Sequence, residues 1–173
     1  MKTFYLPVII VLMCISSCKK DEIANENEFN KSYKAWLNYK SSVHNSYSYT
    51  QNQGSVFGYS AEIKIGVNNG KIISRDFISL RIRPDSTHAI DTTARWHEEN
   101  ATLNTHGNQG GELLTLDDIY TKARTNWLKV DPKNNDIYFE ANNKGMISNC
   151  GYRPKGCQDD CVTGIIISSI SAL

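Results

Sequence analysis

The sequence lacks an excess of charge of either sign. It carries 19 Lys and Arg against 18 Asp and Glu, a formal net charge of +1 at pH 7, and no run of basic residues. Affinity for nucleic acid comes largely from many Lys and Arg contacts to phosphates. We therefore expect no nucleic-acid partner.

Motifs typical of catalysis and cofactor binding are also missing. The sequence has no Gly-x-Ser-x-Gly elbow, no phosphate-binding loop and no helical zinc motif. Single Ser, His and Asp residues are too common for a catalytic triad to be assembled from sequence. We therefore expect no cofactor, no metal and no enzymatic activity.

No apolar run is long enough to span a bilayer, which takes roughly 20 residues. The longest, Phe4 to Met13, follows Lys2 and has the length of a signal-peptide apolar segment. Residues 1–17 are therefore predicted to be a signal peptide that is removed.

The signal peptide ends in Ile15–Cys18, an aliphatic residue, two small residues and a Cys. This pattern resembles a bacterial lipobox, in which the Cys is acylated and becomes the new N-terminus. Cys14 fits less well, because Met13 would occupy the position where a small side chain is required. We predict a lipoprotein anchored to the membrane through acylated, palmitate-bearing Cys18, with plain secretion as the alternative.

Residues 18–27 are predicted to be the lipidated Cys and a flexible tether, because Lys19 to Asn27 is polar and nearly without apolar side chains. The start of the tether resembles the acidic export tags of surface lipoproteins from Bacteroidota; an ordinary linker is the alternative. By analogy with other bacterial lipoproteins, Lys19 after Cys18 favours the outer membrane of the cell envelope over inner-membrane retention. Whether the domain faces the periplasm or the surface stays open.

Residues 28–173 are predicted to form a single α+β domain, mainly an antiparallel sheet packed by an N-terminal helix and a second central helix. Aromatic and aliphatic side chains from Phe29 to Leu37 follow helical spacing. The second helix begins with a capping-box pattern, Thr115 with Asp118, ahead of an apolar stripe that ends at Trp127. This pattern explains the acidic pair Asp117 and Asp118 structurally.

Alternating apolar and polar residues predict strands at 46–51 and 62–67, and Asn69-Gly70 predicts a tight hairpin turn. The strand that returns from Lys71 towards Arg83 changes its apolar phase, which predicts a bulge near residues 75–78. Further strands are expected at 137–139, 146–149 and 164–170.

Residues 84–111 are the least regular stretch and are predicted to be a polar surface insertion. Trp96, His97 and His106 make this stretch the candidate binding loop. The histidine spacing, which also involves His88, does not match a metal-ligand pair, so we expect no metal there.

Three Cys remain besides Cys18 and Cys14, namely Cys150, Cys157 and Cys161. In an oxidising envelope a disulfide is expected, and Cys150–Cys161 is the first choice because the two would face each other across a hairpin. Closing that loop would stabilise the fold by roughly 3 kcal/mol. Cys157 would then be left over, free or linked to a partner; the rival pairing is Cys150–Cys157. A three-Cys zinc site lacks a fourth ligand, and Asp159 with Asp160 is expected to be a solvated turn and not a calcium site.

Several segments of the sequence resemble those of a family of small bacterial envelope proteins of unknown function. They are Trp36 followed by Tyr47-Ser48-Tyr49, Ile65-Gly66-Val67-Asn68-Asn69-Gly70-Lys71-Ile72, Leu116-Asp117-Asp118-Ile119-Tyr120 and the closing residues 160–167. The resemblance covers roughly residues 29–170 and implies the same order of helices and hairpins. It implies no reaction and no catalytic residue.

We therefore expect a membrane-anchored envelope lipoprotein that acts as a non-catalytic binding or accessory module for an envelope protein, peptide or glycan. The alternative is an envelope enzyme or thiol-redox protein that uses His97 and Glu98, or Cys157 as a nucleophile.

Overall fold

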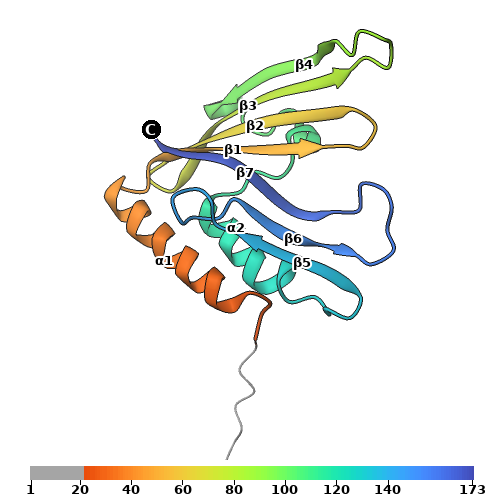
Figure 1. Ribbon diagram of the computed structural model, residues 1–173. Coiled ribbons are helices and arrows are strands. Elements are labelled where there is room, and N and C mark those ends of the chain that lie inside the picture. The colour runs from red at the N-terminus through yellow and green to blue at the C-terminus, as the bar shows by residue number, and fades with distance from the viewer. Residues whose placement is uncertain (1–21) are drawn as a thin grey trace, which may run out of the picture.

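The computed structural model describes residues 22–173 as one seven-stranded antiparallel sheet with two α-helices (Figure 1), which confirms the predicted α+β class. The strand order is β4-β3-β2-β1-β7-β6-β5. The predicted signal peptide and Cys18 lie outside the described residues. The elements are α1 (Glu26–Ser42), β1 (Tyr47–Gly54), β2 (Tyr59–Asn68), β3 (Lys71–Ile82), β4 (Ile90–Glu99), η1 (Asn100–Thr102), η2 (Gly107–Gly110), α2 (Leu116–Lys122), the π-helical turn η3 (Ala123–Trp127), β5 (Asn135–Glu140), β6 (Asn149–Pro154) and β7 (Thr163–Ala172).

The folded part of the chain begins earlier than the predicted tether boundary at residue 27. Ile23 packs against the hydrophobic core, and the Ala24 amide donates a hydrogen bond of 2.8 Å to the carbonyl of Leu128. Helix α1 then starts at Glu26. The residues before the helix are fixed by a partner about a hundred positions away, which local composition does not reveal.

The predicted hairpin turn at Asn69 and Gly70 is confirmed, joining β2 to β3. Both residues have positive φ, 47° and 76°, as a two-residue turn matched to the twist of the strands requires. A positive φ costs Asn little conformational free energy and costs Gly none.

The predicted bulge near residues 75–78 is misplaced. The register between β2 and β3 shifts where Gly66 pairs with Ser74 but Val67 pairs with Ile72, so Ile73 is the extra residue. A second shift, at Thr93, separates the pairs Ser79–Ala94 and Leu80–Thr92. The first bulge places Arg75 and Phe77 on the same face of the sheet as the core.

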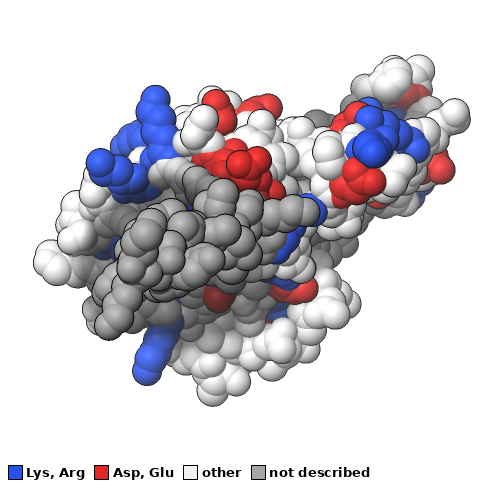
Figure 2. All heavy atoms as spheres, turned by 90° about the horizontal axis from the view of Figure 1, so that it is seen from below, with Lys and Arg blue, Asp and Glu red and all other residues white. Residues whose placement is uncertain are grey.

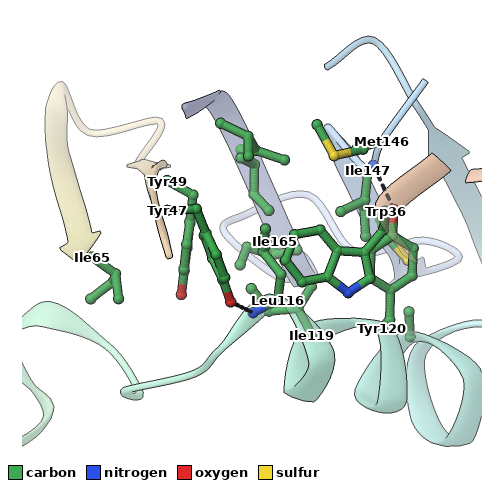
Figure 3. Packing of buried hydrophobic residues seen from close by; sticks show 14 of the residues in the cluster. Trp36, Tyr47, Tyr49, Ile65, Leu116, Ile119, Tyr120, Met146, Ile147 and Ile165 are labelled. Carbon is green, nitrogen blue, oxygen red and sulfur yellow. Dashed lines mark hydrogen bonds between the residues drawn. The ribbon is translucent and has the colours of Figure 1, made fainter. Parts of the chain in front are cut away.

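One face of the sheet carries the core, and tyrosine side chains join it to the segment that leads into α2 (Figure 3). The Tyr47 hydroxyl accepts a hydrogen bond of 2.9 Å from the Leu116 amide, and the Tyr49 hydroxyl donates one of 2.6 Å to the Leu114 carbonyl. Trp36 of α1 meets Tyr47 edge to face, with ring centroids 4.9 Å apart. Burial raises the pKa of both tyrosines, so their hydroxyls stay neutral.

The predicted capping box at the start of α2 is confirmed. The Thr115 hydroxyl accepts from the Asp118 amide at 3.2 Å, and the Asp118 carboxylate accepts from the Thr115 amide at 2.9 Å. Asp117 instead accepts from the Trp36 indole at 3.0 Å and from Lys40 at 2.7 Å. Both acids therefore have structural roles, as predicted.

The prediction of an irregular insertion over residues 84–111 is wrong in its centre. Residues 90–99 form strand β4, which pairs with β3 and makes one edge of the sheet. An edge strand is exposed along most of its length, and Glu98 is the only residue of β4 that is fully buried. The apolar alternation that predicts a strand is therefore nearly absent here.

The preferred disulfide Cys150–Cys161 is also wrong, because Cys157 pairs with Cys161 inside the β6–β7 loop. Cys150 lies on β6 opposite Ile165 and is buried as a free thiol. Burial raises the pKa of this thiol to about 12, so it stays protonated and packs as a small apolar side chain.

Candidate functional site

The predicted binding residues Trp96, His97 and His106 do not form one site. Trp96 and His106 stack with ring centroids 4.2 Å apart and planes within 2°, and Phe77 stacks on Trp96 at 4.7 Å. His97 points to the opposite face of β4, where its Nδ1 lies 2.7 Å from Asp76 Oδ1. His88 lies in the loop before β4. The structure therefore joins two of the three residues and separates the third.

Beneath the Trp96–His106 stack lies an ion pair between Arg75 and Glu98, at 2.8 Å, with both side chains fully buried. Glu98 accepts from the amides of Asn104 and His106, at 2.9 and 2.6 Å, and from the His106 ring at 2.9 Å. Arg75 donates to two carbonyls of the same loop, those of Gly107 and Gly111. Residues 100–111 are thus wrapped around the pair.

This arrangement removes Glu98 as a candidate general base. Burial alone would raise the pKa of the carboxyl, but the hydrogen bonds from His106, Asn104 and Arg75 outweigh burial and lower the pKa to about 2. A carboxylate that is fully ionised and fully hydrogen-bonded has no free acceptor for a substrate proton. His97 lies on the other face of β4 and Cys157 is in a disulfide, so the residues of the predicted enzymatic alternative are not brought together.

A cleft opens where β1 and β7 diverge. The two strands pair from Tyr47–Ala172 to Asn52–Ile166 and then separate, since β1 continues with β2 while β7 continues with β6. Two hollows, of about 230 and 370 Å³, border this split and share four lining residues. We call this pair of hollows the β1–β7 cleft; the shared residues are Gln51, Gln53, Gly164 and Ile165.

Carboxamides form the polar wall of the cleft. The φ of Gly111 is 72°, and a Cβ built there would lie 3.1 Å from Gln53 Nε2 and 3.3 Å from Gln51 Nε2, so both amides converge on this glycine. Gln51 Nε2 also lies 3.5 Å from the Gly110 carbonyl. Asn52 lies between Gln51 and Gln53 on β1, so its side chain alternates to the opposite face of the strand, and it lines only the larger hollow.

Apolar side chains form the floor of the smaller hollow, and an ion pair without net charge lies at its rim. Leu114, Trp127 and Ile165 line the floor, and Trp127 and Ile165 are buried in the core. Lys122 and Glu112 pair at the rim, so the site carries no net charge. On the face seen from below, Figure 2 likewise shows side chains of both signs interspersed.

Sequence reasoning missed this cleft. The sequence predicts Gln51 as the end of a strand and Trp127 as a core residue, and both predictions describe local structure only. The available signal was the unbroken run Gln51-Asn52-Gln53. The spacing of residues in the sequence does not show that β7 pairs with β1 over part of its length and then diverges from it.

Asp160 fixes the outer end of the cleft. Its carboxylate accepts from the Ser55 hydroxyl at 2.6 Å and from the Val56 amide at 2.9 Å, which joins the β6–β7 loop to the β1–β2 turn. The hydrogen bond from Ser55 lowers the pKa of Asp160. Asp160 is exposed in a bend, as expected of a solvated turn residue, and it also bridges segments about a hundred residues apart.

Replacing both Cys157 and Cys161 by Ser is expected to lower the free energy of unfolding by about 2 kcal/mol, because the disulfide closes a short loop. Urea unfolding measures this change, and hydrogen exchange at the Val56 amide should become faster as Asp160 gains freedom. Cys150→Ser serves as a contrasting variant, since it alters a buried thiol and leaves the loop closed. Unchanged exchange at Val56 in the double variant would contradict the bridging role.

Within residues 22–173, no helix is both long and apolar enough to cross a bilayer. Searches against family models, curated proteins and solved structures found no match to this chain.

Proposed function

We propose that this chain is a lipid-anchored protein of the bacterial envelope that binds a ligand in the β1–β7 cleft without catalysis. The signal peptide and lipobox pattern of residues 1–18 support the anchor. The observation that carries the binding role is the divergence of β1 and β7 after the pair Asn52–Ile166. It leaves a hollow lined by side chains that can donate and accept hydrogen bonds.

The proposed anchor lies close to the folded domain. Five peptide units separate Cys18 from Ile23, which packs on the core, and a fully extended chain of that length reaches about 18 Å. The region around the start of α1 would therefore stay near the bilayer. In Figure 1 the start of α1 and strand β4 lie on opposite sides of the molecule, with the split between β1 and β7 between them.

Cys18→Ala is expected to move the protein from the membrane fraction to the soluble fraction, because the variant has no thiol to acylate. Fractionation of the expressing cells, with detergent extraction of the pellet, measures the shift. Cys14→Ala is the matched control and should remain with the membrane. Membrane retention of the Cys18→Ala form, or release of the Cys14→Ala form, would overturn the proposed anchor.

The binding role is tested by amide NMR on the mature Cys18→Ala chain, titrated with saccharide and peptide digests of the cell envelope. We expect saturable shifts at the amides of Gln51, Gln53 and Gly164. Shifts confined to other parts of the sheet, or none with either digest, would count against the cleft as the site.

A further inference from the structure

We propose that the ligand of the β1–β7 cleft is a neutral saccharide, bound through one sugar ring in the smaller hollow. This inference rests on the proposed function and adds the chemical class of the ligand.

The polar groups of the cleft match hydroxyls. A carboxamide offers two donors and an acceptor on one planar group, and a sugar hydroxyl both donates and accepts. Gln51 and Gln53 present such groups side by side, within 3.3 Å of the Cβ position at Gly111. The Lys122–Glu112 pair adds a cationic donor and an anionic acceptor without a net charge. A charged ligand would find no uncompensated partner among these groups.

The floor of the hollow matches the apolar side of a sugar ring. Leu114, Trp127 and Ile165 form a surface beside the carboxamides. A pyranose likewise has C–H groups on its faces and hydroxyls around its edge. An apolar floor bordered by a few polar groups that fix orientation is the usual construction of a small-ligand site.

The size of the cleft favours a sugar ring over an extended peptide. The smaller hollow, at about 230 Å³, lies below the range of roughly 300–1,000 Å³ for drug-sized ligands, a size that suits a single sugar ring. A peptide would need a length of free strand edge to pair with. Beyond Asn52, β1 offers only Gln53 and Gly54 before the Ser55 amide bonds back to Tyr59 at 2.8 Å.

The test uses the mature Cys18→Ala chain, with calorimetry and amide NMR. The probes are neutral oligomers of glucose, mannose, galactose and N-acetylglucosamine, and uncharged peptides of similar mass. We expect at least one oligosaccharide series to bind saturably with shifts at Gln51, Gln53 and Gly164. Gln53→Ala should weaken that binding about 3- to 10-fold, because it removes one or two neutral hydrogen bonds. Gln53 is exposed, so its truncation should leave folding intact, and the exposed Gln109 outside the cleft provides the matched control Gln109→Ala.

The outcomes separate this inference from the proposed function. Binding of peptides and not sugars in the cleft would overturn the saccharide class and leave the binding role standing. Absence of any binding in the cleft would overturn both. Sugar binding that Gln53→Ala leaves unchanged, or that shifts amides elsewhere, would overturn the saccharide site in this cleft.

Discussion

Glu98→Ala is expected to lower the free energy of unfolding by about 3–5 kcal/mol, as measured by urea unfolding followed by tryptophan fluorescence. The substitution leaves the Arg75 guanidinium fully buried without its counter-charge, and removal of one partner of a buried pair is strongly destabilising. It also removes the acceptor for the amides of Asn104 and His106. Residues 100–111 should then exchange their amide hydrogens faster than the rest of the sheet.

Two controls test this account. The double variant Arg75→Met/Glu98→Leu removes both charges and should recover much of the loss, since a buried ion pair and an apolar pair of similar volume are often close in stability. Glu62→Ala removes a carboxylate from the exposed face of β2 and should change stability by no more than about 0.5 kcal/mol. A loss below about 1 kcal/mol in Glu98→Ala would show that the pair does not hold the loop.

The contribution of Glu98 also has a defined pH dependence. Its pKa is about 2 in the folded protein and has an ordinary value of 4.5, so the folded state favours the ionised form. The stabilisation is fully present above pH 4.5 and is lost as the pH falls from 4.5 towards 2. The stability difference between the wild type and Glu98→Gln should therefore shrink over that interval and stay constant above it.

The parts of the fold that sequence predicts well are those set by neighbouring residues. The Asn69-Gly70 turn follows from the low cost of positive φ at these two residue types. The start of α2 follows from hydrogen bonds between Thr115 and Asp118, three positions apart. Both structures are complete within a few residues, so the pattern alone is sufficient.

Strand β4 and the bulge at Ile73 depend instead on partners distant in sequence. β4 is a strand because β3 lies beside it, and its exposed polar residues carry almost no periodic signal. The phase change in β3 shows that a bulge exists, but the position of the bulge is set by the pairing with β2. His97 and Glu98 face opposite sides of the sheet because they are consecutive residues of β4, and the side chains of a strand alternate between its two faces.

The candidate site is predicted least well because every part of it is non-local. Gln51 and Ile165 meet only through the pairing of β1 with β7, and Asp160 meets Ser55 only through two loops at one end of the sheet. The disulfide shows the converse. Cys157 and Cys161 are four residues apart and form a disulfide within one loop. Cys150, the partner that the sequence favours for Cys161, lies instead on β6 with its side chain buried in the core.

Gly164→Ala is expected to lower the free energy of unfolding by about 3 kcal/mol or more. Gly164 pairs with Gly151 across β7 and β6, and its φ is 155°, which L side chains rarely adopt. A Cβ at this position would lie 2.1 Å from the carbonyl oxygen of Cys150 and 2.6 Å from the Gly151 Cα. Backbone atoms cannot rotate away as a side chain can, so overpacking and backbone strain add together. Thermal and urea unfolding should both detect the loss.

Gly54→Ala is the matched control, because Gly54 borders the same cleft from β1 and a Cβ there would meet no atom within 4 Å. This variant should be neutral or more stable by about 0.4–1 kcal/mol, since alanine restricts the unfolded chain more than glycine does. A Gly164→Ala protein as stable as Gly54→Ala would mean that β6 and β7 lie further apart than the structure places them. Gly164 and Ile165, which line the cleft, would then also lie at other positions. The stability difference between the two glycine variants therefore tests the geometry of the proposed site.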